Sequence, residues 1–159
     1  LTSFSEDMRQ RGLTPGGHVI SMNTEPADAK VADALKVPEG EPVFRLERVR
    51  LAGDEPMAVE TLSIPVVLCP GLAQEELEGK SLYNLLQEKF GLVLDHAEQS
   101  FEASKATARE AKLLRVSRHA AVLRVERLTF DPRHKPVEYT LSVYRGDRYK
   151  LHVTMSRNG

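Results

Sequence analysis

The chain has very little of several features that would by themselves assign a class. Among its 159 residues there is one cysteine and no tryptophan. Cys69 alone allows no disulfide within the chain, and with five scattered histidines it offers none of the spacings that bind zinc. We therefore expect a reducing compartment, the cytoplasm, and no metal or other cofactor. The longest apolar runs, such as residues 64–69, are far shorter than the roughly 20 residues of a membrane span, so no membrane association is expected.

An excess of charge of one sign is also lacking. There are 22 lysines and arginines against 23 aspartates and glutamates, and no basic segment, so we do not expect this chain itself to bind nucleic acid. Phosphate-binding loops, dinucleotide motifs and nucleophile elbows are absent from the sequence, which disfavours an enzyme. The histidines are read as surface or turn residues and Cys69 as a small buried hydrophobic residue. Leu1 stands where a complete protein has methionine, so we expect something upstream of it.

Apolar spacing and turn residues predict a mixed chain of short helices and strands. Capping boxes mark two helix starts, at Ser3 and Thr107, and Gly91 marks a helix end. Tight turns join neighbouring strands, so we expect one α+β domain over residues 1–159 with a mostly antiparallel sheet flanked by helices. The expected helices are 3–11, 27–35, 81–90 and 107–114, and the expected strands are 16–22, 43–51, 57–64, 92–101, 122–130, 137–144 and 148–155. The last of these strands is where we expect contacts with a partner.

The sequence contains an apparent internal repeat. Residues 27–65 align with residues 106–144 at a constant offset of 79 without gaps, with 12 identities in 39 positions. Each copy reads as one helix followed by one hairpin. Two copies of this length predict a single pseudo-symmetric sheet rather than a stacked solenoid. Chance similarity between two amphipathic patterns is the alternative.

Two arginines continue an apolar stripe in the first predicted hairpin. Leu46, Arg48 and Arg50 share one face because side chains alternate along a strand. A three-residue loop centred on Asp54 would place Arg48 opposite Glu60 and pair the apolar residues, whereas a two-residue loop would separate these sets; the coherent pairing favours the longer loop. The guanidinium groups could then bind a phosphate or carboxylate. A structural Arg–Glu pair at the sheet edge is the alternative.

A second candidate site lies at the start of the predicted helix 81–90. A helix N-terminus presents free amide groups and positive dipole character, so Ser81 with the nearby hydroxyl of Tyr83 could complete an anion site. Alternatively, Ser81 is an ordinary N-cap and Tyr83 packs inward. Around the last turn, Glu138, Tyr144 and residues 145–149 form a polar cluster, which is typical of a solvated connection.

Several motifs together resemble one known family over essentially the whole chain. They are residues 1–8 (LTSFSEDM), 48–52 (RVRLA), 55–60 (EPMAVE) and 142–149 (SVYRGDRY). These segments look like the effector-binding (UTRA) domain of HutC-type GntR transcriptional regulators, and within that family like the N-acetylglucosamine-utilisation repressors. The resemblance implies a chorismate lyase-like fold, a homodimer, and an N-terminal winged helix-turn-helix domain, absent from this chain, through which alone DNA would be bound.

The resemblance also implies roles for individual residues. Backbone amides of Phe4 and Ser5, together with the Ser5 hydroxyl, would bind a phosphate that is completed by Arg48, Arg50, Ser81 and Tyr83. The sugar ring and its substituents would be contacted by Glu60, Glu138 and Tyr144. The implied function is effector sensing without catalysis, with glucosamine 6-phosphate or N-acetylglucosamine 6-phosphate as the expected effector. A small chorismate lyase-like enzyme acting on an anionic metabolite, with Glu60 or Glu138 as acid or base, remains the alternative; a purely structural dimerisation module is disfavoured by the two arginines.

Glu138 fits this implied site least well. Simple alternation puts it on the face opposite Leu141 and Val143, and the repeat aligns Glu60 with Tyr139 instead. A bulge in the last hairpin, or a cavity beyond the sheet edge, would be required.

Overall fold

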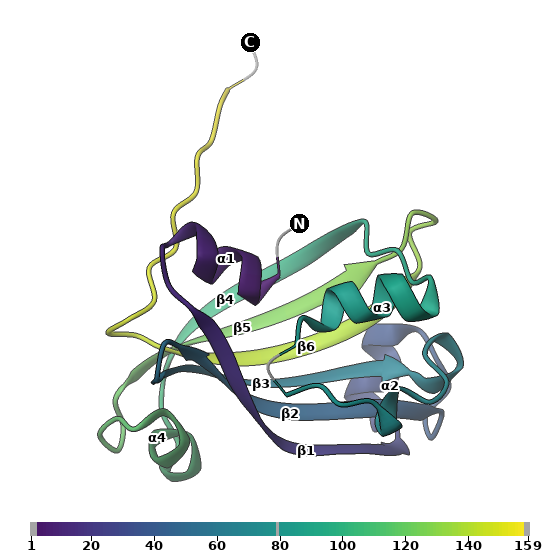
Figure 1. The fold of residues 1–159 in the computed structure, drawn as a ribbon, viewed down its shortest axis with the longest axis horizontal. Coiled ribbons are helices and arrows are strands. Elements are labelled where there is room, and N and C mark those ends of the chain that lie inside the picture. Colours follow the sequence, from purple (N-terminus) through teal and green to yellow (C-terminus); the bar gives the residue numbers. More distant parts are fainter. Residues whose placement is uncertain (1–2, 79, 158–159) are drawn as a thin grey trace.

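A six-stranded antiparallel sheet forms the centre of the domain (Figure 1). The structure, a computed structural model, describes residues 3–78 and 80–157. Its strands run in the order β1-β2-β3-β6-β5-β4, which confirms the predicted α+β class and antiparallel sheet. The elements are α1 (Phe4–Gln10), β1 (Pro15–Pro26), α2 (Ala29–Leu35), β2 (Pro42–Ala52), β3 (Glu55–Pro65), the 3-10 turns η1 (Val66–Leu68) and η2 (Leu72–Gln74), α3 (Leu82–Phe90), β4 (His96–Lys105), α4 (Ala108–Leu114), β5 (Ala121–Phe130) and β6 (Pro136–Arg145).

Local sequence signals set the helix ends. Both predicted capping boxes form: the hydroxyls of Ser3 and Thr107 each accept from the backbone amide three residues on, and the glutamate there accepts from the backbone amide of the capping residue. At the end of α3, Gly91 adopts a left-handed conformation with φ 63°, and Leu92 donates to the carbonyl of Leu86. Leu92 is therefore part of the helix stop, and β4 begins at His96 rather than at residue 92 as predicted.

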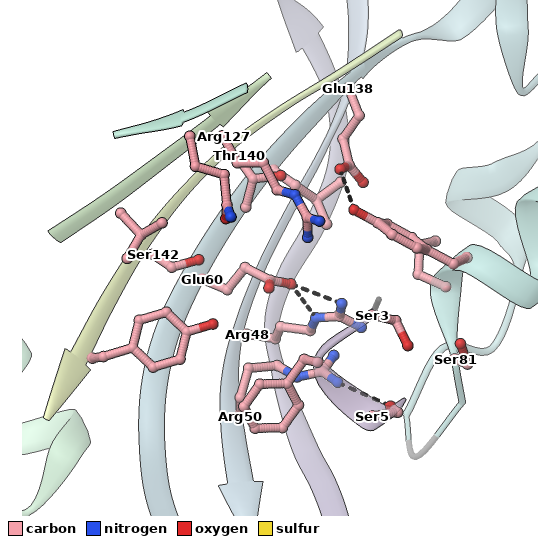
Figure 2. A pocket seen from close by; sticks show the side chains of 17 residues that line it. Ser3, Ser5, Arg48, Arg50, Glu60, Ser81, Arg127, Glu138, Thr140 and Ser142 are labelled. Carbon is pink, nitrogen blue, oxygen red and sulfur yellow. Dashed lines mark hydrogen bonds and ion pairs between the residues drawn. The ribbon is translucent and has the colours of Figure 1, made fainter. Parts of the chain in front are cut away.

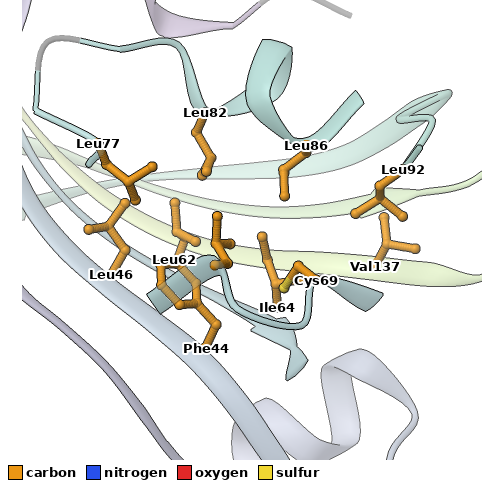
Figure 3. Close-up of a cluster of buried hydrophobic side chains, with 11 residues drawn as sticks. Phe44, Leu46, Leu62, Ile64, Cys69, Leu77, Leu82, Leu86, Leu92 and Val137 are labelled. Carbon is orange, nitrogen blue, oxygen red and sulfur yellow. The ribbon is translucent and has the colours of Figure 1, made fainter. Parts of the chain in front are cut away.

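The sheet is covered on both sides. We call the side that carries Phe44 and Leu46 the front face; α3 packs there, and α2 and α4 pack on the back face. The front core joins strand residues with leucines of α3 and of the segment before it (Figure 3). Cys69 lies in this core, 1% exposed, and burial raises the pKa of its thiol to about 12, which confirms it as a buried hydrophobic residue.

The β2–β3 hairpin has the predicted register but not the predicted loop. Arg48 pairs with Glu60, as expected. The loop, however, is the two-residue turn Gly53-Asp54, with φ 62° at Gly53, and the register is restored by a bulge next to Arg50. The prediction of a longer loop was therefore wrong. One extra residue in β3 gives the same register as one extra residue in the loop would.

The two halves of the sheet have the same order of elements. A strand, a helix and a hairpin follow one another in β1-α2-β2-β3 and again in β4-α4-β5-β6, and β3 pairs with β6 where the halves meet. The ungapped alignment does not hold throughout. Arg48 pairs with Glu60, whereas Arg127 pairs with Thr140, so the spatial offset is 79 in β5 but 80 in β6. Glu60 therefore corresponds in space to Thr140 rather than to Tyr139.

The prediction of a seventh strand over residues 148–155 is wrong. In the described part of the chain, β6 ends at Arg145, a turn follows, and the chain runs past α1 as an extended segment (Figure 1). Since β3 and β5 already flank β6, the chain leaves the sheet here. Arg11, the residue that follows α1, contacts this segment: it donates to the carbonyl of Lys150 and lies over the ring of Tyr149. Among residues 3–78 and 80–157, no helix is long and apolar enough to cross a membrane.

Candidate functional site

A buried, charged cavity lies on the front face where β2, β3, β5 and β6 meet the starts of α1 and α3 (Figure 2). It encloses about 550 Å³ of empty space, part of which is open to solvent. All nine residues singled out in the sequence line this one cavity: Phe4, Ser5, Arg48, Arg50, Glu60, Ser81, Tyr83, Glu138 and Tyr144. The structure thus brings the candidate residues together, while their role in binding stays a prediction.

Strand register explains why these side chains share the cavity. Arg48 pairs with Glu60, and Glu60 pairs with Ser142, so the three lie side by side across β2, β3 and β6. The β3–β6 pairing continues without a register shift, and alternation from Ser142 carries Glu138 to the same front face.

The prediction that a bulge, or a cavity beyond the sheet edge, is needed to place Glu138 is wrong, because the regular β3–β6 register already puts Glu138 on the front face. The last hairpin does contain a bulge, at Val137, but it precedes Glu138 and leaves the β3–β6 pairing untouched. The error came from taking Leu141 and Val143 as the markers of the core side of β6. They lie on the back face, where Val143 packs against the α4 cluster, because this sheet is covered on both sides.

Arg48 and Glu60 form a buried ion pair. The Arg48 Nε and Nη2 atoms lie 2.8 and 2.7 Å from Glu60 Oε1, and the residues are 7% and 8% exposed. Burial alone would raise the pKa of Glu60, but the nearby charges of Arg48 and Arg50 outweigh it and hold this pKa below its ordinary value. Glu60 is therefore ionised and its charge is matched within the site.

Arg50 is buried, and among the described residues it forms no ion pair of its own. It is 5% exposed; its Nη2 donates to the Ser5 hydroxyl at 3.3 Å, and its guanidinium lies 4.4 Å from the centre of the Phe4 ring. Its Nε has no hydrogen-bond partner among the described residues. Burial and the charge of Arg48 lower the pKa of Arg50 to about 10, which still leaves it cationic at neutral pH. A buried cation of this kind is suited to an anionic ligand.

Glu138 lies on the far side of the cavity from Arg50 in Figure 2. It is 1% exposed, and its Oε1 accepts from the Tyr83 hydroxyl at 2.9 Å and from the Thr129 hydroxyl at 3.1 Å. Burial, and then the charge of Glu60, raise the pKa of Glu138. Burial and Glu138 likewise raise the pKa of Tyr83, so this phenol stays a donor. The Tyr83 hydroxyl is thus engaged with Glu138.

The helix starts at the cavity leave donors available. Ser81 is the N-cap of α3, but within the described residues its side chain makes no capping hydrogen bond. In α1 the capping box engages the amides of Ser3 and Glu6. The amides of Phe4 and Ser5, which lie between them, have no helical carbonyl to donate to, because the first turn of any helix lacks such partners.

The sequence prediction missed five polar lining residues: Ser3, which was read only as a helix cap, Gln99, Arg127, Thr140 and Ser142. Arg127 is the most important, since it adds a third guanidinium, which lies 5.9 Å from the centre of the Tyr83 ring. A signal for it existed, because the repeat aligns Arg127 with Arg48. Thr140 and Ser142 could be found only once the face of Glu138 was known.

Outside the cavity, one histidine pair contradicts the expectation of scattered histidines. The His96 Nε2 and His134 Nδ1 atoms lie 2.8 Å apart, and the two rings stack beside Phe130. Within the described ranges, no cluster of three or more His, Cys, Asp or Glu is arranged to hold a metal ion.

Sheet, helices and cavity together define an effector domain of the kind found in GntR-family transcriptional regulators. The solved effector domain of PhnF from Mycobacterium smegmatis superposes with a TM-score of 0.91 at 28% identity, covering 98% of this chain and 95% of that one. A model of the UTRA domain matches residues 10–150. The chain belongs to the UTRA domain family.

The curated relatives include proteins named as transcriptional repressors. NagR of Bacillus subtilis (strain 168) is 36% identical over 157 residues, which are 99% of this chain and 64% of that protein. The mannosyl-D-glycerate transport/metabolism system repressor MngR of Escherichia coli (strain K12) is 27% identical over 157 residues, with 99% and 65% covered. The chain thus spans less than two thirds of the length of these relatives.

Proposed function

We propose that this domain binds a small phosphorylated amino sugar and that binding controls an attached DNA-binding domain. The observation that carries the proposal is the buried charge of Arg50, which has a hydroxyl and an aromatic ring beside it and, within residues 3–78 and 80–157, an Nε atom without a hydrogen-bond partner. A phosphate group would supply the missing negative charge and accept from several donors at once.

The phosphate would lie between Arg50 and the two helix starts. The guanidinium groups of Arg48 and Arg50 donate hydrogen bonds there. Further donors are the hydroxyls of Ser5 and Ser81 and the first backbone amides of α1. The sugar would extend toward Glu60, Tyr144 and Glu138, with Tyr83 positioning Glu138. The name of MngR, which refers to a glycoside, supports a sugar derivative; the amino-sugar assignment rests on the motifs of the sequence.

Regulation would follow from differential affinity. We infer that the parent protein carries an N-terminal DNA-binding domain, acts as a cytoplasmic homodimer and changes its operator affinity when the effector prefers one arrangement of the dimer. The first helix is suited to transmit the change, because Ser5 contacts Arg50 in the cavity while Arg11 contacts the segment after β6.

An enzyme is the second candidate, and Glu138 is the observation that favours it. A buried carboxyl with a raised pKa is typical of a general acid. The names of the relatives favour the regulator, and we propose that the domain has no catalytic activity. Product formation on incubation with sugar phosphates would favour the enzyme.

Calorimetric titration tests the proposal. Glucosamine 6-phosphate and N-acetylglucosamine 6-phosphate would each be compared with the corresponding unphosphorylated sugar. Saturable binding of a phosphorylated sugar is expected, with a loss of at least about tenfold in affinity in Arg50→Met, because a charge-assisted contact is removed.

The matched control is Arg45→Met. Arg45 lies on the same strand but on the opposite face, where it forms an ion pair with Glu25. The Arg45→Met variant is expected to bind the phosphorylated sugar with the affinity of the unchanged domain. Equal loss in both variants, or binding that does not need the phosphate, would contradict the proposed site.

A further inference from the structure

The chain after β6 has the pattern of a strand but no place in its own sheet. We call residues 149–157 the C-terminal segment. Apolar and polar side chains alternate along it, and three of the apolar ones are exposed: Leu151 by 46%, Val153 by 61% and Met155 by 88%. A single exposed apolar residue is common, but three that share one side of an extended segment indicate a surface for interaction.

The C-terminal segment does not pack tightly on the sheet that it leaves. Figure 1 shows it running past α1 and out beyond the rest of the domain. A hollow of about 1220 Å³, part of it open to solvent, lies between residues 149–152 of the segment and Gln99 of β4. The contacts of Arg11 are at the start of the segment, with Tyr149 and Lys150. The apolar side chains further along are therefore accessible to another molecule.

The two edges of the sheet, β1 and β4, differ in how well they resist a further strand. β1 begins at Pro15, ends at Pro26 and has a bulge after Val19, and prolines and bulges at an edge discourage pairing with another chain. β4 contains no proline and pairs with β5 over all ten of its residues without a register shift. Its outer edge therefore presents backbone groups that can pair with a further strand.

The two faces of β4 match the two sides of the C-terminal segment. On the front face β4 carries Phe101, which is 38% exposed, and on the back face it carries Glu98 and Glu102, both exposed. The segment has its apolar side chains on one side and Lys150 and His152 on the other, and it contains no acidic residue. Paired strands place neighbouring side chains on the same face. A pairing that puts the apolar residues beside Phe101 therefore puts the basic side beside the glutamates.

We propose that the C-terminal segment of one copy adds as a strand to the outer edge of β4 in a second copy, and that the reciprocal contact closes a two-fold dimer. The inference rests on the homodimer of the proposed function and assigns its interface. Each copy offers one segment and one edge, so a reciprocal exchange uses both and leaves neither for a third copy.

Analytical ultracentrifugation of the unchanged chain and of two variants tests the interface. Leu151→Glu combined with Val153→Glu alters the segment, and Phe101→Glu alters the edge. Each variant is expected to weaken dimerisation at least about tenfold, because it places a charge in an apolar contact. Circular dichroism would confirm that each variant is folded, and the segment variant changes only exposed side chains.

The control for these variants is Val67→Glu. Val67 is an apolar residue of η1 that is 73% exposed, so the change adds the same charge to the surface away from the proposed contact. It is expected to leave the dissociation constant of the dimer within about threefold. A monomeric unchanged chain, or a dimer that the segment variant does not weaken, would overturn the inference.

Disulfide cross-linking tests whether the contact joins two copies. Leu151→Cys, Val153→Cys and Met155→Cys cover three registers, and each would be mixed with a separately prepared Phe101→Cys chain and oxidised. The native Cys69 is buried and does not compete. At least one mixture is expected to give a linked heterodimer, and absence of a link in all three would overturn the inference.

The same cysteines distinguish pairing within one chain. In a chain that carries both Val153→Cys and Phe101→Cys, a disulfide formed inside a monomer would show that the segment folds onto its own β4, which would overturn the inference. Val67→Cys mixed with Phe101→Cys is the control and is expected to give no linked heterodimer.

Calorimetry separates this inference from the proposed function. Phe101, Leu151 and Val153 lie outside the cavity that we assign to the effector. A monomer that still binds a phosphorylated sugar would overturn the interface alone. A dimer that responds to the variants as expected but binds no sugar phosphate would overturn the proposed ligand and would support the interface.

Discussion

The front face of the sheet changes its chemistry along β2 and β3. At one end Phe44 pairs with Ile64, and both are buried among leucines of α3 and its neighbours (Figure 3). Four residues further along, Arg48 pairs with Glu60 in the cavity (Figure 2). The strands, the face and the register are the same. One end stabilises the fold by burying apolar surface. At the other end charged groups are removed from water at a cost in free energy, and they form the proposed anion site.

The largest effect is expected from Phe44→Ala at the apolar end. Removing a fully buried ring leaves a cavity in the front core, so the free energy of unfolding should fall by about 4 kcal/mol. Urea unfolding followed by circular dichroism would measure it. A loss below about 1 kcal/mol would show that this end does not carry the stability assigned to it.

Breaking the ion pair at the charged end should have the next largest effect. Arg48→Met leaves the carboxylate of Glu60 buried without its main partner and is expected to destabilise the domain by about 3 kcal/mol. Arg48→Met combined with Glu60→Leu removes both charges and should recover most of this stability. If the double variant were as unstable as the single one, the loss would come from packing and not from charge.

The smallest effect is a pH dependence of opposite sign at the two glutamates. The folded-state pKa of Glu138 is raised, so its contribution to stability is present below about pH 4.3 and is lost as the pH rises through that raised pKa. The pKa of Glu60 is lowered, so its contribution is present above about pH 4.3 and is lost as the pH falls through that lowered pKa.

Unfolding of Glu138→Gln and Glu60→Gln across a pH series would show this contrast. As the pH rises, the free energy of unfolding of Glu138→Gln should increase relative to that of the unchanged domain. As the pH falls, Glu60→Gln should lose less stability than the unchanged domain does. Both differences should be smaller than the effect of Arg48→Met. Parallel pH profiles for the two variants would show that the two carboxyl groups do not differ.

The sequence predicted the apolar-to-charged change in β2 and β3 because a regular alternation governs both strands. The pairing of Arg48 with Glu60 was predicted by choosing the loop length that pairs the apolar residues, and the register is right although the loop is not. The placement of Glu138 could not be predicted in the same way, since its face depends on how β6 pairs with β3, a contact between distant parts of the chain. Arg127 was visible as a counterpart of Arg48 but was not recognised as a site residue.

The errors in the fold have a common physical origin. A bulge and a longer loop give the same register, so the sequence could not distinguish the Gly53-Asp54 turn from a three-residue loop. Residues 148–155 alternate like a strand, but alternation does not say whether a neighbouring strand is available. Here β6 is already paired on both sides, by β3 and β5.

The pairing of β3 with β6 also has a consequence for the order of folding. Each hairpin joins residues that are close in sequence, whereas the β3–β6 ladder joins Ala58 to Tyr144, 86 residues apart. Closing so long a loop is slow and entropically unfavourable, so local hairpins form before it. Arg48, Arg50 and Glu60 come from one hairpin, and Glu138 and Tyr144 come from the other. A chain with both hairpins formed but not yet joined would hold every one of these groups without a cavity between them, so we expect ligand binding to require the β3–β6 pairing.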